Sequence, residues 1–216
     1  RGSYDWDYAV YFCNYIDPYQ LKNNIWPPYK TIHTIEVDHV PICAVVKRES
    51  KKDFEGLKLL DQRNFAAAVP ILEEVIQKES YNEIVMLRLA EAYIQMNQFD
   101  DAQRIINKCL AIYPDYDKAL NLKGISFMQK ENYNEAISTF IYIVTKVNYR
   151  FVTSYHNLAL IYLRKNDPET AKNYLRKSIE INSSFKPAYL LMADILNRQG
   201  LTSEANQYMQ IANTLE

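Results

Sequence analysis

The chain has 216 residues, of which 48% are hydrophobic and 24% are charged, so it is long enough to bury a core and has an ordinary globular composition. Its 25 basic and 26 acidic side chains leave a formal net charge of −1. This balance argues against a nucleic-acid partner, because neutralisation of phosphates supplies much of the affinity for nucleic acids. Four glycines are too few for a glycine-rich loop that cradles phosphates.

Residues 1–48 differ in composition from the rest, since nine of the first 29 residues are aromatic. We expect a short helix within residues 7–23 and an extended connector at Trp26-Pro27-Pro28. Two β-branched runs then flank Asp38-His39, which predicts a hairpin near residues 31–46. The sequence therefore predicts an aromatic-rich α/β cap over residues 1–48.

A repeat dominates residues 49–216. One alanine recurs at intervals of 34, 34, 35 and 34 residues, at Ala68, Ala102, Ala136, Ala171 and Ala205. A second small residue lies twelve positions before each alanine, at Gly56, Ala90, Gly124, Ala159 and Ala193. A bulky residue follows three positions later, at Leu59, Tyr93, Phe127, Tyr162 and Leu196. These matched columns indicate a repeat protein.

Each repeat is predicted to form two antiparallel helices. Small residues let two helices approach closely, and apolar residues at helical spacing fill the space between them. Turn signals such as Asn64-Phe65 separate the helices within a repeat, and Tyr113-Pro114-Asp115 separates two repeats. Because one repeat cannot bury its apolar face alone, the repeats must stack, and the predicted fold class is mostly α.

These columns resemble the tetratricopeptide repeat family over residues 49–216. The resemblance implies a right-handed α-α superhelix, or solenoid, of about five helix pairs. The predicted repeats span 49–82, 83–116, 117–151, 152–185 and 186–216. The sequence departs from the family pattern at Glu55, where an apolar residue is usual, and at Pro168 and Thr202, where an aromatic residue is usual. The alternative is the 35-residue pentatricopeptide family, which binds RNA, but the spacing and the charge disfavour it.

The family resemblance implies a non-catalytic scaffold that binds a peptide or protein segment in a concave groove, without a cofactor. The groove positions on the first helix of each repeat hold Asp53, Leu57, Asp61, Leu87, Glu91, Ile94, Gln95, Asn121, Ile125, Met128, Gln129, His156, Leu160, Leu163, Arg164, Asp194 and Arg198. The charged residues in this set are acidic in the first two repeats and become basic in the last two. This mixture of aliphatic and charged side chains suits a segment with apolar anchors and a few charges. A subgroup that grips the C-terminal carboxylate of chaperones is matched only at Lys118, so that activity is not expected.

The remaining candidates for chemistry are interpreted as structural. His33, Asp38 and His39 are surface residues of the hairpin rather than a metal site, and no nucleophile–base pair is evident. Cys13 and Cys43 would pair only in an oxidising compartment, and buried thiols are the alternative. Cys109 falls at a core position of its repeat. We therefore predict no catalytic residue, no metal and no cofactor.

A second resemblance concerns residues 26–46. They are similar to the soluble C-terminal stretches of bacterial multi-spanning glycosyltransferase-like membrane proteins, some of which end in tetratricopeptide repeats. This resemblance implies an alternative function, that of an extracytoplasmic accessory domain attached to the membrane through an upstream region. The other interpretation is that the aromatic segment covers the open apolar face of the first repeat. The sequence leaves the compartment open between cytoplasm and periplasm, and it identifies neither the partner nor the oligomeric state.

Overall fold

The structure is a computed structural model that describes residues 8–12, 29–38, 40–48, 52–78 and 82–215. The chain divides into two compact units, residues 1–105 (unit 1) and residues 106–216 (unit 2). The division falls within helix α5 (Phe99–Ile112).

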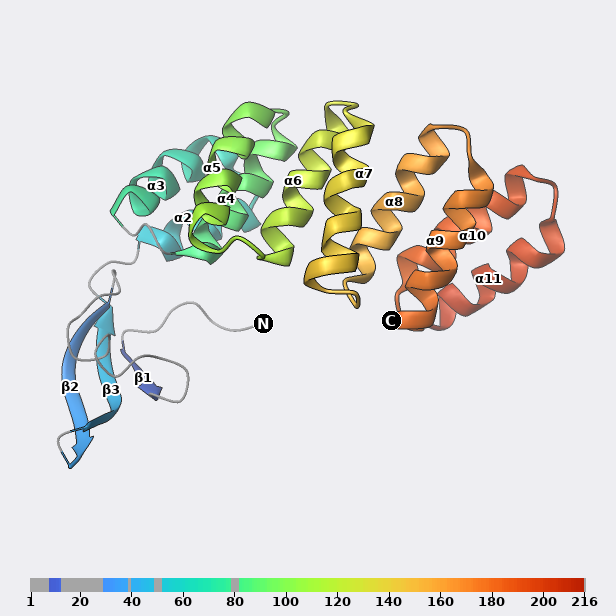
Figure 1. Cartoon of the computed structure of the whole chain (residues 1–216). Helices are drawn as coiled ribbons and strands as arrows, with labels where there is room; N and C mark the ends of the chain where they lie inside the picture. Colours follow the sequence, from blue (N-terminus) through green and yellow to red (C-terminus); the bar gives the residue numbers. More distant parts are fainter. Residues whose placement is uncertain (1–7, 13–28, 39, 49–51, 79–81, 216) are drawn as a thin grey trace. The chain divides into compact units, whose positions relative to one another are not determined.

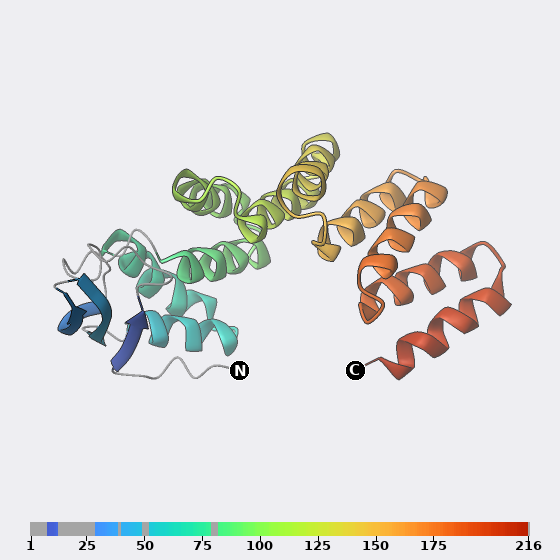
Figure 2. The same ribbon diagram turned by 60° about the horizontal axis from the view of Figure 1, so that its bottom comes forward.

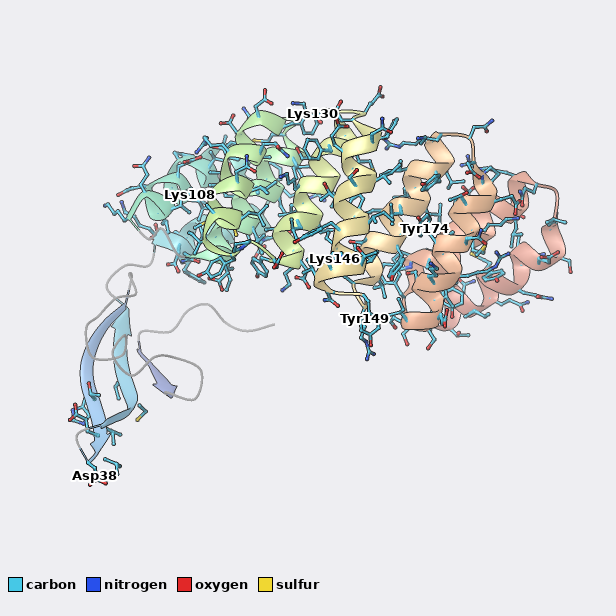
Figure 3. All side chains as sticks on the ribbon, in the orientation of Figure 1. Asp38, Lys108, Lys130, Lys146, Tyr149 and Tyr174 are labelled. Carbon is cyan, nitrogen blue, oxygen red and sulfur yellow. The ribbon has the colours of Figure 1, made fainter. Side chains whose placement is uncertain are left out.

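Unit 1 begins with a three-stranded antiparallel sheet in the order β1-β3-β2 (Figure 1). Its strands are β1 (Tyr8–Phe12), β2 (Tyr29–Val37) and β3 (Val40–Arg48). Strands β2 and β3 pair over the segment for which the sequence predicts a hairpin, with Val37 opposite Val40. Asp38 has a φ of 51°, as two-residue hairpin turns require, and Figure 3 shows it at the tip of the ribbon.

The predicted helix over residues 7–23 is wrong for Tyr8–Phe12, which form strand β1 and pair with β3. The segment reads Tyr-Ala-Val-Tyr-Phe, and aromatic and β-branched residues favour a strand when a partner strand supplies the backbone hydrogen bonds. Residues 13–23, the connector at 26–28, Cys13 and His39 lie outside the described residues.

Helices α2 (Lys52–Asp61), α3 (Phe65–Lys78), α4 (Glu83–Gln95) and the first half of α5 complete unit 1. Helix α2 packs on α3, and α4 packs on both. Leu72, Ile76, Met86 and Leu89 are almost fully buried between them. The Tyr93 hydroxyl donates to Glu73 at 2.7 Å, and Arg104 donates to the same carboxylate at 2.6 Å, so one carboxylate of α3 links α4 and α5.

Unit 2 contains three further helix pairs, which follow one another with alternating direction (Figures 1 and 2). Its elements are α6 (Asp117–Gln129), α7 (Tyr133–Tyr142), the π-helical turn η2 (Ile143–Val147), α8 (Val152–Arg164), α9 (Pro168–Ile181), α10 (Lys186–Arg198) and α11 (Thr202–Thr214). One core cluster is centred on Phe140, Leu158 and Ile161, and a second is centred on Leu175 and Met192.

The prediction of a mostly α fold built from consecutive helix pairs is confirmed. The alanine column shows why the sequence folds in this way: Ala68, Ala102, Ala136, Ala171 and Ala205 all have 0% exposure. Each lies in the second helix of its repeat, where a larger side chain would hold the two helices apart.

The turn within each repeat has one conformation, which occurs five times. The residue two positions after the first helix has a positive φ, and these residues are Arg63, Asn97, Glu131, Asn166 and Gly200. The next backbone N–H donates to the carbonyl of the bulky column residue, for example from Asn132 to Phe127 at 2.9 Å and from Leu201 to Leu196 at 2.9 Å. This is the bond of the Schellman motif, which satisfies a helix-terminal carbonyl.

The π-helical turn η2 accounts for the one interval of 35 residues. It lies between Ala136 and Ala171, the two alanines that are 35 rather than 34 residues apart. A π-helical turn takes up one residue more than an α-helical turn. The extra residue is therefore absorbed at the end of the α7 helix, and α8 begins in register with the other repeats. Figure 3 shows Tyr149 in the loop between η2 and α8.

Candidate interaction surface

The sequence-predicted groove residues fall on the first helices of the repeats, in two sets that belong to different units. The unit 1 face comprises those on α2 and α4, namely Asp53, Leu57, Asp61, Leu87, Glu91, Ile94 and Gln95. The unit 2 face comprises those on α6, α8 and α10, namely Asn121, Ile125, Met128, Gln129, His156, Leu160, Leu163, Arg164, Asp194 and Arg198.

Not all of these side chains are open to a partner. Asp53, Leu57, Asn121 and Met128 are buried, with exposures between 4% and 9%. The side chains at Asp61, Gln95, Gln129, Arg164 and Arg198 are exposed. The others are half-buried, so each offers part of its surface while it packs on the helices behind it. The contact area offered by each face is therefore smaller than the predicted set.

On the unit 1 face, three predicted residues come together around a hollow of about 200 Å³. These are Asp61 from α2 and Glu91 and Gln95 from α4. The hollow is completed by residues that the groove positions do not include, namely Leu60, Arg63, Phe65, Arg88 and Ala92. Apolar groups therefore lie beside charged ones, as in sites that anchor a side chain and fix its orientation.

Arg88 organises this hollow. Its guanidinium donates to Asp61 at 2.5 Å and to Glu91 at 2.8 Å, so it joins α2 to α4. All three side chains are at least 38% exposed, and such surface pairs contribute little to stability, about 0–1 kcal/mol. Two carboxylates around one guanidinium leave a net negative charge, which favours a cationic group in the hollow.

On the unit 2 face, a buried hydrogen bond joins the first helices of neighbouring repeats. The Asn157 amide on α8 donates to the Asn121 carbonyl oxygen on α6 at 3.1 Å. Ile125 and Leu160 pack as half-buried residues on the same core cluster. The two asparagines therefore join α6 to α8, and the half-buried Ile125 and Leu160 add apolar surface to the exposed polar residues of the face.

His156 is the titratable group of the unit 2 face nearest to neutral pH. Its ring lies edge-on to Phe185 with centroids 5.8 Å apart. Burial lowers the pKa of His156 below its ordinary value of 6.5, and a hydrogen bond with the Asn157 side chain opposes this shift in part. The neutral imidazole is therefore the form that the folded chain favours.

Sequence reasoning missed Arg88 and Asn157, which occupy the sixth position of their repeats, next to the predicted groove positions. A signal for Arg88 was present, because Arg88 and Glu91 are three residues apart in a helix and oppositely charged pairs at that spacing are neighbours. The bond from Asn157 to Asn121 spans 36 residues and has no local signal.

Three of the other candidate residues, one histidine and two cysteines, lie in the described part of the chain. His33 is exposed on β2, and Cys43 and Cys109 are buried. Among the described residues, no group of three or more His, Cys, Asp or Glu side chains is placed to hold a metal ion. Within the same part of the chain, no helix is long and apolar enough to cross a membrane. The pairing of Cys13 with Cys43 stays a prediction.

The fold defines a helical-repeat protein with an open face on the first helix of each repeat. Two models of the tetratricopeptide repeat match the sequence, one over residues 59–125 and the other over residues 152–185. The chain belongs to the tetratricopeptide repeat family, whose members form scaffolds for protein interaction. Neither match includes residues 26–46, so the resemblance of that segment to the C-terminal stretches of membrane proteins stays a prediction.

Two proteins are similar to part of the chain at low identity. The chain is 22% identical to protein NPGR1 of Arabidopsis thaliana over 59% of its own length, and 21% identical to anaphase-promoting complex subunit 3 of Schizosaccharomyces pombe over 52%. It spans only 19% and 17% of the lengths of those two proteins.

Two solved structures show the same fold. For PilF of Pseudomonas aeruginosa the TM-score is 0.64 at 23% identity, and the match covers 75% of this chain and 73% of that one. For MamA of Desulfovibrio magneticus the TM-score is 0.59 at 15% identity, with coverage of 77% and 96%. At such identities the likeness establishes the fold alone.

Proposed function

We propose that the chain binds a segment of another protein on the first-helix faces of its repeats. The observation that carries the proposal is the hollow on the unit 1 face, where Asp61, Glu91 and Gln95 meet beside the apolar side chains of Leu60 and Phe65. A peptide side chain with an apolar stem and a polar end would find both kinds of contact there.

The half-buried aliphatics on both faces support the same function. Leu87 and Ile94 of α4, and Ile125 and Leu160 of α6 and α8, all keep accessible surface beside polar neighbours. An isolated aliphatic side chain at a surface needs no explanation, but Ile125 and Leu160 hold the same position in neighbouring repeats. They would supply apolar anchors, and the neighbouring polar groups would fix the register of the bound segment.

The test is peptide selection followed by affinity measurement. The full chain is used to select binders from a displayed library of random 12-residue peptides, and the recovered sequences are synthesised with a fluorescent label for anisotropy titration. Leu87→Glu and Leu160→Glu place a charge on the unit 1 and unit 2 faces respectively. We expect each recovered peptide to bind at least one of them about tenfold more weakly, a change of about 1.4 kcal/mol.

Matched controls place the same charge on second helices. Gln77→Glu on α3 and Asn173→Glu on α9 are exposed substitutions outside the residues that line the hollow or form either face, and they should leave the affinity unchanged. Asn121 is not a suitable test position, because a glutamate there would be buried and would break the bond to Asn157. The proposal is overturned if peptides bind both face variants as tightly as the unchanged chain while thermal unfolding shows all variants folded.

A further inference from the structure

The unit 2 face carries a short apolar strip. Ile125 and Leu160 are half-buried on α6 and α8, and Leu190 on α10 is 39% exposed, a high value for a leucine in the middle of a helix. Leu190 holds the same repeat position as His156 on α8, one helical turn before the position of Leu160. Ile125 and Leu160 hold the same repeat position, and together with the exposed Leu190 they provide apolar anchoring points on the first helices of three consecutive repeats.

Two of the three helices that carry this strip end in an arginine. Arg164 is the last residue of α8 and Arg198 is the last residue of α10, at the same position of their repeats. Arg164 is exposed and makes no ion pair with any residue in the described part of the chain. Arg198 is 74% exposed and pairs with Asp194 at 2.9 Å, four residues earlier on the same helix. An exposed pair of that kind contributes little to stability, so Arg198 can exchange its partner at little cost.

The charges next to this basic end form a separate group outside the unit 2 face. Lys165 follows Arg164 and lines a hollow at the turns with Glu131 and Glu135, and these three charges sum to −1. Asp194 is the one carboxylate among the predicted positions of the unit 2 face. The two arginines and Asp194 therefore sum to a net charge of +1, opposite in sign to the cluster around Arg88 on the unit 1 face.

We infer that the unit 2 face selects a segment of a partner protein that presents apolar side chains to Ile125, Leu160 and Leu190 and carboxylates to Arg164 and Arg198. This inference rests on the proposed function and adds the chemistry of the ligand. A guanidinium binds a carboxylate through two parallel hydrogen bonds, which fixes orientation as well as sign. On the unit 1 face the guanidinium of Arg88 is already shared between two carboxylates, so the same selection is not expected there.

The test compares selections from the random 12-residue library on two proteins, the full chain and the double variant Arg164→Glu/Arg198→Glu. We expect the unchanged chain to enrich peptides that combine Leu, Ile or Phe with Asp or Glu, and the double variant to lose that acidic enrichment. One recovered acidic peptide and its counterpart with Gln for Glu are then titrated by anisotropy. The acidic form should bind the unchanged chain at least tenfold more tightly than it binds the double variant, and added salt should reduce the difference.

The matched control is Arg176→Glu/Lys177→Glu on α9, which makes the same charge change on an exposed second helix and should retain the acidic preference. Equal affinity of the acidic peptide for the unchanged chain and the Arg164/Arg198 variant would overturn the inference. If peptides still lose affinity with Leu160→Glu in that case, the proposed function stands and only the acidic selectivity fails. If neither Leu87→Glu nor Leu160→Glu weakens any peptide, the proposed function itself fails.

Discussion

In unit 1, Arg88 lies between Asp61 and Glu91, whereas in unit 2 the ends of α8 and α10 present Arg164 and Arg198 to water. The two units nevertheless bury the same repeat positions. The alanine column is fully buried in both, and the turn after each first helix has the same positive φ. Packing between paired helices therefore determines which residue types occupy the buried columns. The exposed positions of the first helices are not constrained in this way, so they can differ in charge between the two units.

The largest expected difference in stability between the two units comes from the column of small residues on the first helices. A Cβ atom added to Gly124 would lie 2.6 Å from two ring atoms of Phe140, and one added to Gly56 would lie as close, 2.6 Å, to the Cγ atom of the buried Leu72. Three other repeats already hold alanine at this position, at Ala90, Ala159 and Ala193, and there the residue sixteen positions later is Ile106, Leu175 or Met209. An alanine is thus compatible with a flexible aliphatic partner but not with the rigid ring.

We expect Gly124→Ala to lower the free energy of unfolding by about 1–2 kcal/mol, because overpacking costs about 1–3 kcal/mol and the helix gains back about 0.5–1 kcal/mol on replacing glycine. Gly56→Ala should change it by less than about 1 kcal/mol, in either direction. Chemical denaturation of both variants measures the difference. The double variant Gly124→Ala/Phe140→Leu should recover part of the loss, since it recreates the Ala159–Leu175 pair, and purely additive effects would contradict the explanation.

A smaller effect on the free energy of unfolding is expected at the turns within the repeats, which occur in both units. Arg63 in unit 1 and Glu131 in unit 2 have φ values of 58° and 61°, a region that costs a side-chain-bearing residue about 1–2 kcal/mol. We expect Arg63→Gly and Glu131→Gly each to raise the free energy of unfolding by up to about 1 kcal/mol, and Gly200→Ala to lower it by a similar amount. A Cβ atom at Gly200 would meet nothing within 4 Å, so its cost comes from the backbone alone. Denaturation midpoints of the three variants check the signs, and a destabilising Glu131→Gly would contradict the account.

Much of the fold could be predicted from the sequence because the repeat supplies five copies of each local signal. The alanine column and the bulky column gave the helix pairs, and the bulky residues also accept the turn hydrogen bonds. The turn conformation could not be predicted from all five copies, since Gly200, Asn97 and Asn166 are residue types found at positive φ, whereas Arg63 and Glu131 are not. Strand β1 was missed because its pairing partner β3 lies some 35 residues away, beyond the reach of local patterns.

The interaction surface was predicted less well, for a related reason. Repeat position identifies which helix side a residue occupies, but whether it is accessible depends on the neighbouring helix. Leu57 and Met128 were predicted to line the groove and are nevertheless 5% exposed, whereas Leu190, which was not among the predicted residues, is 39% exposed. The charges are also rearranged by contacts that a single repeat does not contain, such as the pair between Arg88 and Asp61 from neighbouring repeats.

The smallest expected effect is a dependence on pH that belongs to unit 2 alone. His156 and Leu87 occupy the same position of their repeats, so the unit 2 face carries a titratable ring where the unit 1 face carries an aliphatic side chain. Burial lowers the pKa of His156 in the folded chain, while in the unfolded chain it should titrate near 6.5. Between these two pKa values the unfolded chain binds more protons, so the stability contributed by the neutral ring is complete above pH 6.5 and is lost as the pH falls through this window.

His156→Leu gives unit 2 the residue that unit 1 already has, and it should remove this part of the pH dependence. We expect the free energy of unfolding to fall more steeply between pH 7.5 and 5.5 for the unchanged chain than for His156→Leu. Chemical denaturation at a series of pH values measures both slopes, and NMR titration of the His156 ring protons should give a midpoint below 6.5. Equal slopes, or a midpoint above 6.5, would show that the ring is hydrated in the folded chain and that its contact with Phe185 does not shield it from water.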